Sequence, residues 1–110
     1  MDDIQIKESS NFSTKAISAF IESIFGEFIA PEYTQEGVSE FKKYIDPAKI
    51  NERLSNNHFM LFALDEENKI AGLLEMRNFD HVSMLFIRKD MQRKGIGKRL
   101  LSGAIKKCLK

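Results

Sequence analysis

The chain has 110 residues, of which 43% are hydrophobic and 30% are charged, and its formal net charge is +1. This length and composition fit one soluble domain with a core of its own. The single Cys108 excludes an internal disulfide, and the longest apolar run, Phe59–Leu64, is too short to cross a membrane. The acidic N-terminus lacks the basic-then-apolar order of a signal peptide. We therefore expect residues 1–110 to form a single cytoplasmic domain that has no membrane partner.

The charge is distributed unevenly along the chain. Residues 1–81 hold eight Lys and Arg against fifteen Asp and Glu, whereas residues 82–110 hold nine against the single Asp90. The two parts therefore carry formal charges of −7 and +8. This asymmetry favours either an anionic partner for the basic part or a basic part that folds against the acidic one.

The first half of the chain predicts one strand followed by helices. Residues 3–7 alternate apolar and polar side chains, as a short strand does. The next segment has apolar residues at helical spacing, and Asn11 or Ser13 would cap it. Thr34 would cap a second helix, and Asp46-Pro47 would restart the chain as a cap followed by a first-turn proline.

The second half predicts three consecutive strands and a final helix. Phe59–Leu64 is a continuous apolar run, typical of a strand that is covered on both faces. Ile70–Arg77 and His81–Ile87 follow after polar turns, the latter antiparallel to its neighbour. A helix is expected from about Gly95 to the C-terminus. Its predicted apolar stripe consists of Ile96, Leu100, Leu101, Ala104, Ile105, Cys108 and Leu109.

Two glycines lie within the basic stretch MQRKGIGKRLL, residues 91–101, at the start of this helix. A Walker A loop requires Ser or Thr after Gly-Lys, but Arg99 stands there. A dinucleotide-binding fingerprint requires a third glycine at the position of Leu100. Both of these phosphate-binding motifs are therefore excluded.

The segment QRKGIG, residues 92–97, resembles the acetyl-CoA motif of the GNAT N-acetyltransferase superfamily, Gln/Arg-x-x-Gly-x-Gly/Ala. The family places this motif between its fourth strand and its third helix, and the resemblance is strongest over residues 58–105. It implies an α/β (α+β) acyl-CoA N-acyltransferase fold, with a mixed or antiparallel central sheet and flanking helices in the order β-α-α-β-β-β-α. The chain would correspond to the N-terminal two thirds of that fold, ending before the fifth strand.

The charges around the glycines favour an anionic ligand on physical grounds as well. A helix N-terminus leaves four backbone N–H groups unpaired and carries about half a positive charge. Residues 91–95 contain no Ser, Thr, Asp or Asn that could cap it. Four cations surround it: Arg93, Lys94, Lys98 and Arg99. A pyrophosphate would satisfy the amides, the dipole and the cations together. The alternative is that Gly95 serves a tight turn and the cations are solvated.

The resemblance implies acetyl-CoA as the cosubstrate and indicates the residues that would bind it. Backbone groups at the end of the fourth strand would hold the pantetheine arm, and the amides of the glycine loop would hold the pyrophosphate. The matching positions are Leu85, Phe86, Ile87, Gln92, Arg93, Lys94, Gly95, Ile96, Gly97 and Lys98. The implied reaction is direct transfer of acetyl from acetyl-CoA to a primary amine, and no metal site is expected.

The amine proton needs an acceptor, and Glu75 is the candidate base. Glu75 is a carboxylate within an otherwise apolar strand. His81 and Ser83 share one face of the neighbouring strand and could lie across from it. The alternative is that Glu75 pairs with Arg77 or with an opposite residue on a solvated face, and that His81 sits at a turn.

Other functions remain open at this point. A non-catalytic CoA-binding or self-associating module would expose the edge of His81–Ile87, which favours pairing with a second copy. A nucleic-acid partner is not expected, because Phe59, Phe62 and Phe86 lie in apolar runs typical of a core. In members of the family a tyrosine after the fifth strand commonly protonates the thiolate, and no residue here matches it. The acceptor would be a small-molecule or peptide amine.

Overall fold

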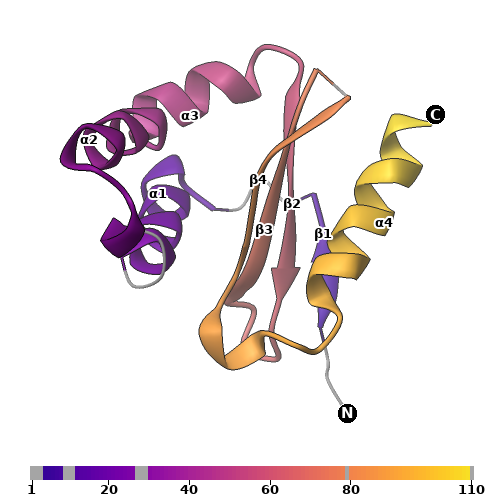
Figure 1. Ribbon diagram of the computed structural model, residues 1–110. Helices are drawn as coiled ribbons and strands as arrows, with labels where there is room; N and C mark the ends of the chain where they lie inside the picture. The colour runs from indigo at the N-terminus through magenta and orange to yellow at the C-terminus, as the bar shows by residue number, and fades with distance from the viewer. Residues whose placement is uncertain (1–3, 9–11, 27–29, 79, 110) are drawn as a thin grey trace. The chain divides into compact units, whose positions relative to one another are not determined.

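The structure is a computed structural model that describes residues 4–8, 12–26, 30–78 and 80–109 (Figure 1). The chain divides into two compact units, and each is described by itself. The first unit combines residues 1–9 with residues 57–110, and the second comprises residues 10–56. The first unit therefore holds the basic segment, the glycine loop and Glu75.

A four-stranded antiparallel sheet in the order β1-β2-β3-β4 forms the base of the first unit. Its strands are β1 (Gln5–Lys7), β2 (His58–Leu64), β3 (Ile70–Arg77) and β4 (His81–Ile87). The predicted bounds of β3 and β4 are confirmed. β1 begins later than predicted, and Asp3 lies outside the described residues. Asn68 and Asn78, both with positive φ, make the turns that join β2, β3 and β4.

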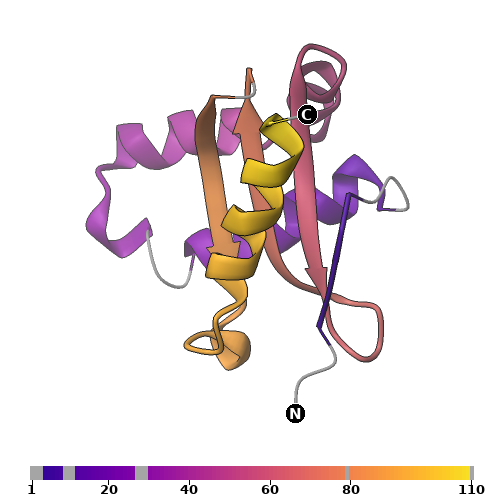
Figure 2. The ribbon, with the colours of Figure 1, turned by 90° about the vertical axis from the view of Figure 1, so that its right-hand side faces the viewer.

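One face of this sheet is covered by α4 (Ile96–Cys108), which lies along the strands (Figure 2). Gly72 permits the close approach, because a Cβ there would lie 2.9 Å from Ile87 Cδ1 and 3.3 Å from Ile96 Cγ2. The core between helix and sheet consists of Ile4, Phe59, Leu61, Ala63, Ala71, Leu74, Met76, Ile96, Leu100 and Ala104. α4 and the segment that leads into it are therefore anchored to β1, β2, β3 and β4.

The predicted apolar stripe of α4 is too wide. Ile96, Leu100 and Ala104 are buried, but Leu101 and Ile105 are 37% and 57% exposed. Leu109, which follows the helix, is 81% exposed. Residues four apart share one helix face, whereas the next residue points about a quarter-turn away. The sheet therefore covers the row that begins at Ile96 and leaves the row that begins at Leu101 on the surface.

The second unit contains α1 (Thr14–Ile24), the short 3-10 helix η2 (Ala30–Glu32), α2 (Gln35–Tyr44) and α3 (Pro47–Leu54). Its helix caps are those that the sequence predicts. The backbone N–H groups of Ala16, Gly37 and Ala48 donate to the side chains of Ser13, Thr34 and Asp46, at 3.0, 3.0 and 3.1 Å. Asn11, the other candidate cap of α1, lies outside the described residues.

No helix in the described part of the chain is long and apolar enough to cross a bilayer.

Candidate functional site

β4 is an edge strand of the sheet. It pairs with β3 along one side, and along its other side no strand of the described residues pairs with it. The N–H of Arg88, the residue after β4, donates to the carbonyl of Ala71 at 2.8 Å. Backbone groups alternate between the two sides of a strand, so those of Phe86 are directed at β3 and those of Leu85 and Ile87 at the open edge. Of the three strand residues predicted to bind pantetheine, Leu85 and Ile87 thus direct their backbone groups away from the sheet, and Phe86 does not.

The segment between β4 and α4 is held at two points. The 3-10 helix η3 (Lys89–Met91) begins it, and Met91 packs against the core under α4. Gln92 Nε2 then donates to the carbonyl of Ile87 at 3.1 Å, which fixes the loop to the open edge of β4. The predicted loop residues therefore start at a defined place beside the strand.

Left-handed backbone occurs twice in the loop that follows. Arg93 has φ of 65° and Gly95 has φ of 77°. A glycine adopts this region freely, but a residue with a side chain loses about 1–2 kcal/mol there. Arg93 is therefore held in its conformation by its surroundings rather than by its own preference. Gly95, in turn, is the N-cap residue of α4.

The start of α4 presents unsatisfied donors. Gly95 supplies no side-chain acceptor, and the first helical hydrogen bond runs from the Arg99 N–H to the Gly95 carbonyl at 3.1 Å. The amides of Ile96, Gly97 and Lys98 therefore have no acceptor within the helix. The helix dipole adds about half a positive charge at the same place.

The space beside these amides is open. A Cβ at Gly97 would meet only Leu85 Cδ2, at 4.0 Å, and a Cβ at Gly95 would meet nothing within 4 Å. Packing therefore does not require glycine at position 97, although glycine costs a helix roughly 0.5–1 kcal/mol relative to alanine. An anion that must approach the amides closely would explain it, so the residues present fit a pyrophosphate group.

Three of the four predicted cations remain available to such an anion. Arg93, Lys94 and Lys98 are exposed. Arg99 instead extends to the N-terminal strand, where its Nη2 donates to the carbonyl of Ile4 at 2.9 Å. Its placement around the anion site was wrong, because this tertiary contact directs the side chain away.

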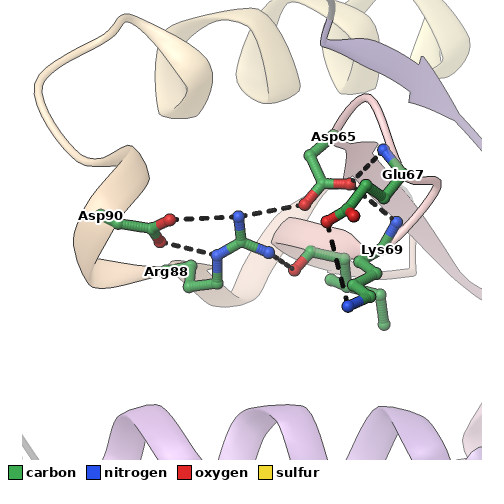
Figure 3. A network of polar contacts seen from close by, with 6 residues as sticks. Asp65, Glu67, Lys69, Arg88 and Asp90 are labelled. Atoms are coloured by element: carbon green, nitrogen blue, oxygen red, sulfur yellow. Dashed lines mark hydrogen bonds and ion pairs between the residues drawn. The ribbon is translucent and has the colours of Figure 1, made fainter.

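Asp90, the single acid of residues 82–110, is bound by Arg88 (Figure 3). Arg88 Nε and Nη2 donate to the two Asp90 oxygens at 2.6 and 3.2 Å. The same guanidinium lies 3.0 Å from Asp65 Oδ2 and donates to the Ile70 carbonyl at 3.1 Å. This Arg88 network, made of Arg88, Asp65, Asp90 and the Ile70 carbonyl, joins the β2–β3 turn to η3.

Hydrogen bonds lower the pKa of both carboxyl groups in the network. The Lys69 and Glu67 amides and the Arg88 guanidinium lower the pKa of Asp65 from its ordinary 3.8, with the Lys69 amide contributing most. The hydrogen bond from Arg88 lowers the pKa of Asp90. A lowered pKa in the folded state stabilises the protein above the unfolded-state value, and this contribution is lost as pH falls through the folded-state value.

Asp65→Asn tests this pH dependence. We expect the variant to be less stable than the wild type at pH 7, and the difference in free energy of unfolding to shrink as pH falls below about 4. Urea unfolding at pH 7, 5 and 3 measures it, and Glu66→Gln, an exposed acid of the same turn, controls for net charge. A constant difference across this pH range would contradict the assignment.

Glu75, the candidate base, has no exposed surface. Ser83 Oγ donates to its Oε1 at 2.8 Å. Glu75 pairs with Met84 and the next β3 residue pairs with Val82, so Ser83 is the extra residue of a β-bulge. The alternative that places Glu75 on a solvated face is therefore wrong, whereas the predicted approach of Ser83 is confirmed.

His81 is the first residue of β4 and does not lie across from Glu75. It lies opposite Arg77 in the strand register, and both residues are exposed. The structure therefore agrees with the alternative that His81 sits at the turn between β3 and β4.

The fold is that of solved acetyltransferases. A GNAT-family acetyltransferase from Staphylococcus aureus Mu50 gives a TM-score of 0.74 at 21% identity, and the match covers 96% of this chain and 66% of that one. PaiA N-acetyltransferase from Thermoplasma acidophilum, solved in complex with coenzyme A, gives 0.75 at 16% identity, with 97% and 72% covered. This chain therefore spans about two thirds to three quarters of the length of these proteins.

The sequence itself carries the family assignment. Residues 29–110 match the family model of the acetyltransferase (GNAT) domain. The chain belongs to the GNAT acetyltransferase family. No curated protein sequence matches it.

Proposed function

We propose that the chain binds acetyl-CoA and transfers its acetyl group to a primary amine. The observation that carries this proposal is the start of α4, where free amides, open space at two glycines and three exposed cations coincide. The amides of Ile96, Gly97 and Lys98 and the cations Arg93, Lys94 and Lys98 bind the diphosphate. The open-edge backbone groups of Leu85 and the backbone N–H of Ile87 bind the pantetheine arm, and Gln92 occupies the Ile87 carbonyl and holds the loop beside them.

The thioester, when bound, supplies an activated acetyl group. The amine nitrogen forms a bond to the acetyl carbon, the carbon–sulfur bond breaks, and the amine gives up one proton as the sulfur leaves as thiolate. The proton passes from the amine to Ser83 Oγ while the Ser83 hydroxyl proton passes to Glu75 Oε1, 2.8 Å away. Ser83 is half-buried, so it connects a buried base to an acceptor that cannot touch the base directly.

The acceptor is a small-molecule or peptide amine. The compartment is the reducing cytoplasm, which the free thiol of Cys108 suits.

The release of free thiol from acetyl-CoA measures the reaction. We expect thiol to appear from acetyl-CoA only when an amine is added, across a panel of polyamines, amino sugars and peptide N-termini. Binding of acetyl-CoA without amine-dependent thiol release would overturn the transfer step.

A non-catalytic CoA-binding or self-associating module is the second candidate. It is favoured by the open edge of β4, where Val82 and Leu85 are 36% and 38% exposed. Unpaired strand edges pair readily with other chains. Dimerisation through this edge would cover the backbone groups assigned to pantetheine, so acetyl-CoA should dissociate such a dimer.

A further inference from the structure

The guanidinium of Arg88 touches three segments that are separate in sequence. It contacts Asp65 in the turn after β2, the carbonyl of Ile70 at the start of β3, and Asp90 in η3. The backbone of Arg88 is fixed as well, because its N–H is bonded to Ala71. Arg88 is therefore held at both ends, and its side chain joins η3 to the sheet (Figure 3).

We propose that Arg88 is the positioning residue of the diphosphate-binding loop, residues 92–98. The inference rests on the proposed function, since it assigns Arg88 a task in acyl-CoA binding at that loop. Arg88 does not itself touch the ligand. It fixes Asp90, and through Asp90 the backbone of η3, from which the chain runs directly to the Gly95 cap of α4.

The geometry of the contact explains why an arginine is needed. Two nitrogens of a rigid fork meet two oxygens of Asp90, which fixes orientation as well as distance. A lysine would supply the charge at a single point and leave the carboxylate free to rotate. After the contact between Arg88 and Asp90 and the contact of Gln92, the chain reaches Arg93, which has a left-handed backbone conformation. Such a conformation persists only where the surrounding structure determines it.

Arg88 also binds Asp90, an acid close to the site, with the guanidinium that contacts Asp65. Asp90 precedes Gly95 by five positions, and Lys94 lies within the range of its charge. With its oxygens bonded to Arg88, Asp90 is kept from drawing Lys94 away from the ligand. The loop thus keeps its positive charge for the phosphates.

The test compares Arg88→Lys, Arg88→Met and Asp90→Asn with the wild type. One readout is calorimetric affinity for CoA and for pantetheine, and the other is the ¹⁵N order parameters of the backbone amides. We expect CoA affinity to fall about 10-fold in all three variants, pantetheine affinity to stay unchanged, and order to fall in residues 92–98 but not in 100–108. Ser102→Gly, an exposed change in α4 that lowers stability, is the control and should alter neither readout.

Arg88→Lys decides the matter, because it keeps the positive charge and loses the two-point contact with Asp90. Wild-type affinity and wild-type loop order in this variant would overturn the proposal. If Arg88→Met does not fold, Asp90→Asn takes its place, because it removes one of the two oxygens that accept hydrogen bonds from Arg88. If the wild type itself binds no CoA, the proposed function fails, and loop order in the variants still decides whether Arg88 positions the loop.

Discussion

Gly97→Glu is expected to reduce the affinity for acetyl-CoA by at least about 100-fold, the equivalent of roughly 3 kcal/mol or two lost charge-assisted hydrogen bonds. The substitution places a carboxylate beside the α4 amides, in the space where a Cβ meets only Leu85 at 4.0 Å. A negative charge near a helix N-terminus is favourable for the fold, so the free protein should stay folded. Isothermal calorimetry measures the loss.

Gly97→Ala separates bulk from charge and has a matched control. Alanine should raise the free energy of unfolding by about 0.5–1 kcal/mol while still weakening acetyl-CoA binding. Ser102→Ala raises helix propensity on the exposed side of α4 and should leave binding unchanged. If both alanine variants bound acetyl-CoA as tightly as the wild type, close approach of a ligand at Gly97 would be refuted.

Glu75→Gln is expected to lower the turnover number about 100- to 10,000-fold and to leave acetyl-CoA affinity nearly intact. The amide keeps an oxygen that can accept the Ser83 hydrogen bond, so the loss reflects the missing proton acceptor rather than a missing contact. Initial rates of thiol release from pH 6 to 9 measure the effect.

Ser83 and an exposed acid provide the controls for Glu75. Ser83→Ala should lower turnover too, whereas Ser83→Thr, which retains a hydroxyl, should restore part of it. Glu66→Gln removes an exposed carboxylate from the β2–β3 turn and should have no effect. Equal rates for the wild type and Glu75→Gln at every pH would exclude Glu75 as the base.

The parts of the fold that local chemistry determines were predictable. The caps Ser13, Thr34 and Asp46 act on amides two or three residues away, so their spacing is visible in the sequence. Strands β3 and β4 are bounded by polar turns, and their limits follow from composition. The glycine loop was found in the same way, because the glycines and their cations are contiguous.

Contacts between distant residues were not predictable. Arg99 and Ile4 are 95 positions apart, and nothing near Arg99 indicates that its guanidinium reaches that carbonyl. The Arg88 network likewise depends on the pairing that brings the β2–β3 turn beside η3. The left-handed Arg93 was missed because arginine has no preference for that conformation.

The neighbourhood of Glu75 shows how a partial prediction arises. Alternation along β3 and β4 brings Ser83 close, but only a bulge aims its hydroxyl at the carboxylate. Bulges leave no fixed pattern in a single sequence. The apolar residues around Glu75 indicated burial, yet the choice between a buried and a solvated carboxylate required the structure.

Calorimetric titration of the 110-residue chain with acetyl-CoA and, in parallel, with pantetheine tests the central claim most directly. The two ligands share the pantetheine arm, and only acetyl-CoA carries the diphosphate. We predict that acetyl-CoA binds at least about 100-fold more tightly than pantetheine, and that the difference narrows as salt rises, because exposed cations contribute to it. Equal affinity for the two ligands, or binding of neither, would contradict the assignment of residues 92–98 as a diphosphate site.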